Sequence, residues 1–314
     1  MTNQVAKAVA SQLSYRCPVC FGVLDSPGGH CAECGRKFPS VQVGKTRIVD
    51  FLSATRPLGE CNCSTDQRQK DGACEIYLDR LRAPKHVVRP RHAKASVLAV
   101  YSRWRNKVVL DAGCREGPLG HMLADHNYVI GLDICPYAML QAAPNALDKG
   151  YGELWIADAT HIPLAADQVD LVLANDILEH VVTPEVLLAE FLRVLKPGGQ
   201  LNITVPNLVS YGNRISILFG SGVGIEPHLL LKGQSMIRPI AGVRYPDQRK
   251  HLRFFTLKSM CRTLEHAGFE IIARRGYDPV LSRLPLGDRI LRNMCSLVAL
   301  RAIKRLSSDP DRSG

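Results

Sequence analysis

The sequence has no run of about 18 or more apolar residues, the length that a helix needs to cross a bilayer. Its N-terminus lacks a long apolar core before a small-residue cleavage site, so we expect no secretory signal. Aromatic residues make up only 6% of the 314 residues, and no aromatic-rich RNA-binding signature is present. These absences predict a cytoplasmic protein without a transmembrane segment.

Lysine and arginine outnumber the acids, giving a net charge of +11 that is spread along the chain. This balance is compatible with RNA, with an anionic acceptor, or with peripheral membrane contact through the basic C-terminus. Charge alone does not choose among these partners. The length suffices for a full α/β domain and a small accessory one.

Eleven cysteines in a chain without a secretory signal predict metal ligation and reduced thiols rather than disulfides. Four of them form two Cys-x-x-Cys knuckles separated by ten residues: Cys17, Cys20, Cys31 and Cys34. Each knuckle can turn two thiolates toward one ion, and two knuckles complete a tetrahedral site. We therefore predict a structural zinc ribbon over residues 1–52. A redox pair, the alternative, needs only one knuckle.

Residues 53–90 are polar, charged and broken by prolines, and we interpret them as a linker. They contain an incomplete ligand set, which predicts free thiols: Cys61, Cys63 and Cys74. The remaining four cysteines fit core or near-core positions: Cys114, Cys135, Cys261 and Cys295.

Short apolar runs alternate with helical patterns from residue 108 onward. The runs that predict strands are 108–111, 128–133, 153–158, 169–174 and 200–205. A helical stretch at 184–195 and a break at 196–199 are expected before the last of these runs. Their alternation predicts a doubly wound, mostly parallel α/β sheet whose ligands bind at the strand C-terminal ends. The first run enters a turn with Gly113 and Gly117, where free N–H groups can face a nucleotide, and residues 118–123 are expected to open a helix. Asp133 follows about 20 residues later, the spacing of a ribose-binding acid.

An ordered series of motifs runs through residues 91–275: Val-Leu-Asp-Ala-Gly-Cys-x-x-Gly, Gly-Leu-Asp, Ala-Asp-Ala, Leu-Glu-His-Val and Leu-Arg-Val-Leu-Lys-Pro-Gly-Gly. The series resembles class I S-adenosylmethionine-dependent methyltransferases, which implies a seven-stranded Rossmann-like sheet over residues 91–314 and S-adenosylmethionine as cofactor. The N-terminal segment resembles a Trm112-like zinc ribbon.

The resemblance also implies which residues bind the cofactor. The glycine turn would lie against its methionine part, Asp133 would bind both ribose hydroxyls, and Asp158 with the Ala159 N–H would meet the adenine. The full predicted set is Asp111, Ala112, Gly113, Cys114, Gly117, Asp133, Ile134, Asp158, Ala159 and Asn175. Arg115 stands where the family usually has glycine. Its side chain either faces solvent, points toward the methionine carboxylate, or crowds the cofactor.

Candidate bases follow the fourth strand. Glu179 and His180 share a helical face with Asp176, and His251 follows the expected acceptor lid at 206–250. We predict that Glu179, His180 and His251 face one cavity, where His180 could act as base. A similar acid-x-x-Glu-His pattern carries metal in ubiquinone-pathway and small-RNA methyltransferases, so Mg²⁺ is one alternative. Bracing of the pocket, with catalysis by alignment alone, is another.

The C-terminal part predicts a helix at 257–267 with Thr256 as N-cap, and a sixth strand at 269–273. The last apolar segment, 296–303, fits an antiparallel seventh strand, with a basic amphipathic surface helix as the alternative. Together these features predict an O-methyltransferase of a small molecule such as a natural product, quinone or sugar. An rRNA or tRNA methyltransferase that clamps its substrate with the ribbon, and a non-catalytic scaffold, are the alternatives.

Overall fold

The computed structural model describes residues 11–26, 28–43, 46–52, 100–115, 119–136, 138–139, 151–218, 251–278, 281 and 290–305. The predicted linker with its three cysteines, Gly117, and residues 219–250 of the predicted lid lie outside the described residues.

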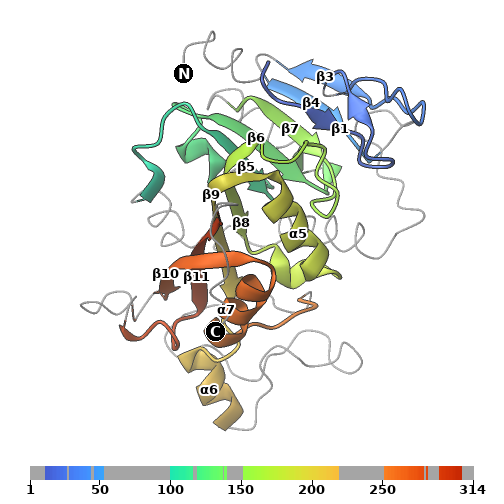
Figure 1. The fold of residues 1–314 in the computed structure, drawn as a ribbon. Coiled ribbons are helices and arrows are strands. Elements are labelled where there is room, and N and C mark those ends of the chain that lie inside the picture. Colours follow the sequence, from blue (N-terminus) through green and yellow to red (C-terminus); the bar gives the residue numbers. More distant parts are fainter. Residues whose placement is uncertain are drawn as a thin grey trace.

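A nine-stranded sheet forms the centre of the molecule, in the order β10-β11-β9-β8-β5-β6-β7-β4-β3 (Figure 1). Seven of its strands are those expected from the motif series: β5 (Val108–Ala112), β6 (Tyr128–Asp133), β7 (Glu153–Ile156), β8 (Val169–Asn175), β9 (Leu195–Pro206), β10 (Phe269–Tyr277) and β11 (Leu297–Lys304). β5 to β9 pair in parallel, and β11 is antiparallel to both neighbours. The seven-stranded Rossmann-like sheet is thus confirmed, and so is the strand predicted at 296–303.

The central strands are buried on both faces. Every residue of β5, β6 and β7 is buried. That is why these strands appear in the sequence as continuous apolar runs and not as alternating ones. Their C-terminal ends lie at one edge of the sheet, because parallel strands point the same way.

The N-terminal segment extends this sheet. β3 (Ser40–Val43) and β4 (Thr46–Asp50) form a hairpin, and β4 pairs in parallel with β7 along Arg47–Asp50. Figure 1 shows this segment, in blue, beside β7. β1 (Tyr15–Arg16) and β2 (Val23–Leu24) form a separate two-stranded sheet. The seven strands expected become nine because β4 covers the edge of β7, whose N–H and C=O groups would otherwise lack partners.

Aromatic rings join the N-terminal segment to the large sheet. The Phe51 ring lies 5.6 Å from Trp155 of β7, and the Tyr15 ring lies 6.1 Å from it. Trp155 Nε1 donates to Glu153 Oε2 at 2.7 Å, so its indole N–H is satisfied inside this contact. The segment and the sheet therefore share one core.

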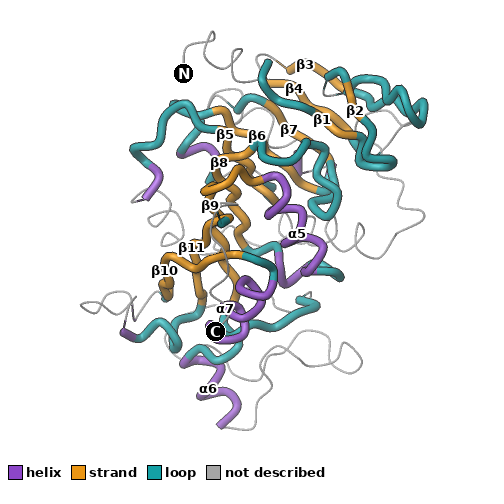
Figure 2. The backbone as a smooth tube through the Cα atoms, in the orientation of Figure 1, coloured by secondary structure: helices purple, strands orange, loops and turns teal. Residues whose placement is uncertain are grey.

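Two of the labelled helices, α5 (Pro184–Val194) and α7 (Leu257–His266), lie against the sheet, while α6 (Tyr211–Leu218) lies at the far end of the molecule (Figure 2). α5 begins with proline and buries Leu187, Leu188, Phe191 and Val194. α6 lies in the predicted lid. α7 is capped by Thr256 in a capping box with Ser259, which confirms the predicted N-cap. None of the described helices is long and apolar enough to span a membrane.

Two local expectations were wrong. The helix predicted after the glycine turn is, among the described residues, a 3-10 turn, η1 (Gly120–Met122). The break predicted at 196–199 belongs to β9 instead. The register of β8 against β9 shifts between Val169 and Leu171 of β8. Residues 196–199 of β9 are therefore extra and form a bulge, and the strand continues beyond them.

Candidate functional site

The glycine turn closes tightly after β5. Gly113 has a φ of +70°, and a Cβ there would lie 3.2 Å from Cδ1 of Ile177. Both Gly113 N and Cys114 N donate to the Leu132 carbonyl, at 2.7 and 3.0 Å. These two N–H groups are therefore bound between β5 and β6 and are not open to a ligand, contrary to expectation.

Asp111 braces the turn from inside. Its Oδ2 accepts from Gly120 N at 2.9 Å and from the Tyr151 hydroxyl at 3.1 Å. Burial raises the pKa of Asp111 to about 6, although both hydrogen bonds act to lower it. Asp111 thus holds η1 against the strand. Sequence patterns gave no signal for Tyr151.

Asp133 ends β6 with both oxygens in hydrogen bonds. Its Oδ2 accepts from Arg115 N and its Oδ1 from Cys135 N, both at 2.9 Å. Burial raises its pKa. Because a carboxylate has about four lone-pair sites, two hydrogen bonds leave capacity for hydroxyl donors.

Asp158 follows β7 at the same edge. Its Oδ1 accepts from both the backbone N–H and the hydroxyl of Thr160, at 2.9 and 2.7 Å. Ala159 beside it is buried, and Ile134 after Asp133 is half-buried. Asn175 ends β8, and its Nδ2 is buried without a hydrogen-bond partner among the described residues. A polar ligand along this edge would satisfy that amide.

The structure brings Glu179, His180 and His251 together: one ligand atom from each lies within 4.8 Å of the others. Glu179 and His180 belong to η2 (Leu178–His180), while His251 precedes α7. Nε2 of each histidine lies 3.9 Å from Glu179 Oε1, and the two rings are 4.8 Å apart. The Glu179 carbonyl accepts from Leu252 N at 2.8 Å, which fastens the His251 segment to η2.

The Glu179 carboxylate is 1% exposed, and neither oxygen has a hydrogen-bond partner among the described residues. Burial raises its pKa well above the usual range, and the Asp176 carboxylate raises it further. Asp176 itself accepts from Thr204 Oγ1 at 3.3 Å, and burial raises its pKa too. Such a buried, unsatisfied acid is costly unless a proton, a cation or a ligand completes it.

Arg115 acts on this group of acids. Its φ is +49°, in the region that favours glycine, which is the residue usual there in the methyltransferases that the sequence resembles. Its guanidinium partly offsets the burial that raises the pKa values of Asp133, Asp176 and Glu179. The side chain therefore bears on the site rather than only on solvent.

The four knuckle cysteines also converge. Cys17 Sγ lies 3.7 Å from Cys34 Sγ, and Cys20 Sγ lies 3.4 Å from Cys31 Sγ. All four sulfurs lie within 4.8 Å of one another, and none forms a disulfide. Four thiols so arranged could share one ion.

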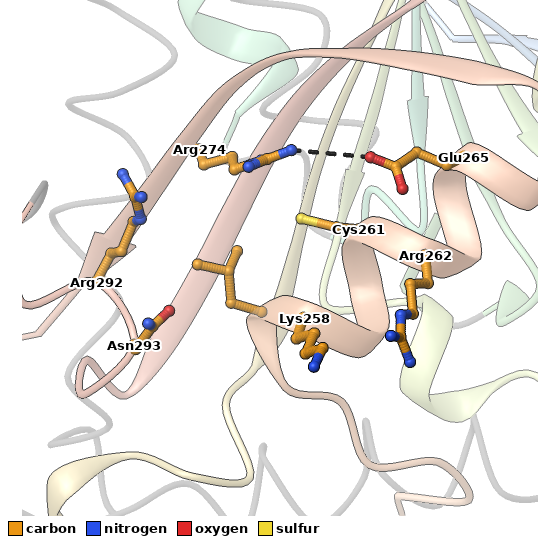
Figure 3. A pocket seen from close by; sticks show the side chains of 8 residues that line it. Lys258, Cys261, Arg262, Glu265, Arg274, Arg292 and Asn293 are labelled. Atoms are coloured by element: carbon orange, nitrogen blue, oxygen red, sulfur yellow. Dashed lines mark ion pairs between the residues drawn. The ribbon is translucent and has the colours of Figure 1, made fainter. Parts of the chain in front are cut away.

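Two surface hollows flank α7, and neither contains a predicted site residue. One, of about 330 Å³, lies between α7 and β10 and surrounds Cys261 (Figure 3). Its Arg274–Glu265 pair is 3.8 Å apart and exposed, so it adds little stability. The other, of about 660 Å³, lies between α5 and α7.

Parts of the chain resemble known proteins. Residues 110–203 match a family model described as a methyltransferase domain. A ubiquinone biosynthesis O-methyltransferase from Dinoroseobacter shibae is 31% identical over 193 residues, which are 58% of this chain and 68% of that protein. A probable S-adenosylmethionine-dependent methyltransferase from Mycolicibacterium smegmatis is 32% identical over 112 residues, 35% of this chain but only 42% of the relative.

Among solved structures, a Burkholderia thailandensis 1,6-didemethyltoxoflavin N1-methyltransferase with bound S-adenosylhomocysteine has a similar fold. Its TM-score is 0.51 at 17% identity, covering 88% of this chain and 98% of that one. At this identity the likeness concerns the fold alone.

Proposed function

Because the chain belongs to the S-adenosylmethionine-dependent methyltransferases, we propose that it methylates an oxygen atom of a small-molecule acceptor. The Glu179–His180–His251 cluster carries the proposal. It places two imidazoles around a buried carboxylate at the ligand edge of the sheet, and that carboxylate has no hydrogen-bond partner among the described residues. The name of the Dinoroseobacter shibae relative, an O-methyltransferase, supports the choice of oxygen. Family membership favours an enzyme over a non-catalytic scaffold.

The residues at the sheet edge fit the cofactor. Asp133 would bind the ribose hydroxyls and Asp158 with the Ala159 N–H would bind the adenine, while the methionine part would lie against the turn at Gly113. Asn175 Nδ2, which has no hydrogen-bond partner among the described residues, supports a polar ligand there. When bound, S-adenosylmethionine supplies a methyl group on a positively charged sulfur, which is the electrophile of the reaction.

His180 is the proposed base. Its side chain is 21% exposed against 8% for His251, so an acceptor reaches it more easily. When the acceptor oxygen is methylated, His180 would take its hydroxyl proton, while the bound cofactor would supply the methyl group and retain the electron pair of the broken bond at its sulfur. Glu179, whose Oε1 lies 3.9 Å from Nε2 of both imidazoles, would stabilise the positive charge that forms on His180.

A metal ion is the alternative occupant of this cluster. Two imidazole nitrogens and one carboxylate suit a transition metal better than Mg²⁺, which prefers oxygen ligands. Where a metal is used, it would bind to Glu179, His180 and His251 and lower the pKa of an acceptor hydroxyl.

Zinc in the N-terminal segment is the second part of the proposal. A tetrahedral site with zinc–sulfur bonds of about 2.3 Å has sulfurs about 3.8 Å apart. The distances between sulfurs of the two knuckles, 3.4 Å for Cys20–Cys31 and 3.7 Å for Cys17–Cys34, are close to that spacing. We assign residues 1–52 as the zinc ribbon and 91–314 as the methyltransferase domain.

The test measures transfer of a labelled methyl group from S-adenosylmethionine to a panel of catechols, quinols and sugars, with tRNA and rRNA fragments as the rival acceptors. We expect a small phenolic or alcoholic acceptor to be labelled and His180→Ala to lower kcat about 10²-fold or more with unchanged cofactor affinity. Chelator treatment that abolishes turnover without unfolding would favour the metal alternative. Labelling of RNA alone, with steep salt dependence, would contradict the small-molecule assignment.

A further inference from the structure

The two cysteine knuckles adopt the same backbone turn with different residues at one position. Phe21 N donates to the Cys17 carbonyl at 2.9 Å, and Gly35 N donates to the Cys31 carbonyl at 2.9 Å. Phe21 and Gly35 therefore occupy equivalent places, each directly after the second cysteine of its knuckle. Both are left-handed, with φ values of +63° and +72°.

Glycine is the residue expected in that conformation. The second knuckle uses it at Gly35, although a Cβ there would meet nothing within 4 Å. The first knuckle carries phenylalanine, a bulky residue for which a left-handed backbone is a strained outlier. Phe21 is 44% exposed, so burial in the ribbon core does not explain why the strain is tolerated.

The Phe21 ring instead contacts the loop after β7. It stacks on His161 with ring centres 6.1 Å apart and planes 30° from parallel. The Arg16 guanidinium lies 5.8 Å from the centre of the same ring, and Arg16 Nε donates to the Phe21 carbonyl at 2.9 Å. Phe21 is thus held by contacts to both His161 and Arg16.

His161 is connected through the Thr160 hydroxyl to Asp158, the acid proposed to bind adenine. Its Nδ1 lies 3.0 Å from Thr160 Oγ1, and that hydroxyl donates to Asp158 Oδ1 at 2.7 Å. Since the Thr160 proton goes to Asp158, the threonine oxygen accepts from His161 in the Nδ1–H tautomer. The His161 backbone N–H also donates to the Asp158 carbonyl at 2.9 Å.

Backbone bonds hold the ribbon to the same loop. Ala165 N donates to the Ser14 carbonyl at 2.8 Å, and Arg16 N donates to the Pro163 carbonyl at 3.4 Å. The loop therefore has one end on β7 and its middle on the ribbon. The Phe21 ring, which belongs to the ribbon and stacks on this loop, can fix the rotation of the side chains at 158–161.

We propose that Phe21 is a positioning residue: through His161 and Thr160 it orients the Asp158 carboxylate, so that the ribbon knuckle sets the affinity of the adenine end of the cofactor site. This inference rests on the proposed role of Asp158. Because Oδ1 is held by Thr160, Oδ2 is the oxygen that would face the ligand.

The test uses the full chain with S-adenosylhomocysteine as the probe in calorimetry, and zinc content as a second readout. Phe21→Gly gives the first knuckle the residue of the second, so we expect unchanged zinc content and equal or higher thermal stability. Affinity should nevertheless fall about three- to tenfold, the size of a lost ring contact, and KM for S-adenosylmethionine should rise while kcat is kept. Phe21→Tyr, which preserves the stack, should restore the affinity.

Val19→Ala is the matched control, since Val19 is 46% exposed in the same knuckle and has no ring to stack on His161. His161→Ala breaks the contact from the other side and covers the case in which Phe21→Gly loses zinc. If both Phe21→Gly and His161→Ala keep full affinity while Asp158→Asn loses it, the positioning role is wrong and the cofactor assignment stands. If Asp158→Asn keeps full affinity, the cofactor assignment itself fails.

Discussion

The backbone N–H of Arg115 donates a hydrogen bond to Oδ2 of Asp133 at 2.9 Å, so a residue with a left-handed backbone is tied to the acid proposed to bind ribose. A glycine at position 115 could donate the same backbone hydrogen bond. Replacing Arg115 with glycine would remove the guanidinium, which lowers the pKa values of three carboxylates of the site.

Arg115→Gly is therefore expected to keep the turn and to change the charge selectivity of the site. S-adenosylmethionine carries a positive sulfonium that its demethylated product lacks. Without the arginine cation, affinity for S-adenosylmethionine relative to S-adenosylhomocysteine should rise about two- to fivefold, the size of one partly screened charge interaction. Calorimetry with both ligands at two salt concentrations measures the ratio. An unchanged ratio would show that the guanidinium lies outside the reach of the sulfonium.

Asp133→Ala tests the ribose assignment. It removes a charged acceptor of two hydroxyl hydrogen bonds, which should cost about 1.5–3 kcal/mol of cofactor binding. The measurement is calorimetric titration with S-adenosylhomocysteine, with Glu270→Gln, an exposed acid of β10, as the control for net charge. Equal affinity in the Asp133 variant and the wild type would count against the site.

Asp111 should make stability depend on pH. Its pKa is about 6 in the folded chain, against an ordinary value of 3.8, because burial disfavours the charge. Because the pKa of this carboxyl is raised on folding, its contribution to the free energy of unfolding is fully present below about pH 4. That contribution is lost as the pH rises to about 6. At 1.36 kcal/mol per pKa unit the loss is about 3 kcal/mol.

Asp111→Asn stays neutral and can still accept from Gly120 N and the Tyr151 hydroxyl, so it should lack this loss. Urea unfolding of both proteins between pH 4 and pH 7 measures the difference, and Asp25→Asn, an exposed position, is the control. The prediction fails if wild type and Asp111→Asn show parallel pH profiles.

Cys31→Ser tests the zinc ligands. Elemental analysis should find about one zinc per wild-type chain and much less in the variant, because a closed four-thiolate site needs all four sulfurs. Since Tyr15 and Phe51 pack against Trp155 of β7, metal loss should lower the melting temperature of the large sheet as well. Cys261→Ser, outside the cluster, should keep both. Full zinc retention in Cys31→Ser would reject the ligand set.

The sequence by itself determined where along the chain the strands that carry the site lie. Buried parallel strands must be continuous apolar runs, and an acid at the end of such a run, as at Asp133 and Asp158, must come to the ligand edge of the sheet. The Cys-x-x-Cys spacing likewise required each pair of thiols to lie together, because a knuckle is a local turn. These inferences depend on neighbours along the chain.

Only the tertiary structure decided what depends on distant residues. The pairing of β4 with β7 could not be predicted, because any exposed strand edge offers the same N–H and C=O groups. The meeting of His251 with Glu179 joins residues that α5, β9 and α6 separate along the chain, and the stack of Phe21 on His161 required the ribbon to dock. A phenylalanine at a glycine position is visible in the sequence. Its partner is visible only once the chain is folded, since the two residues lie on separate elements that pack together.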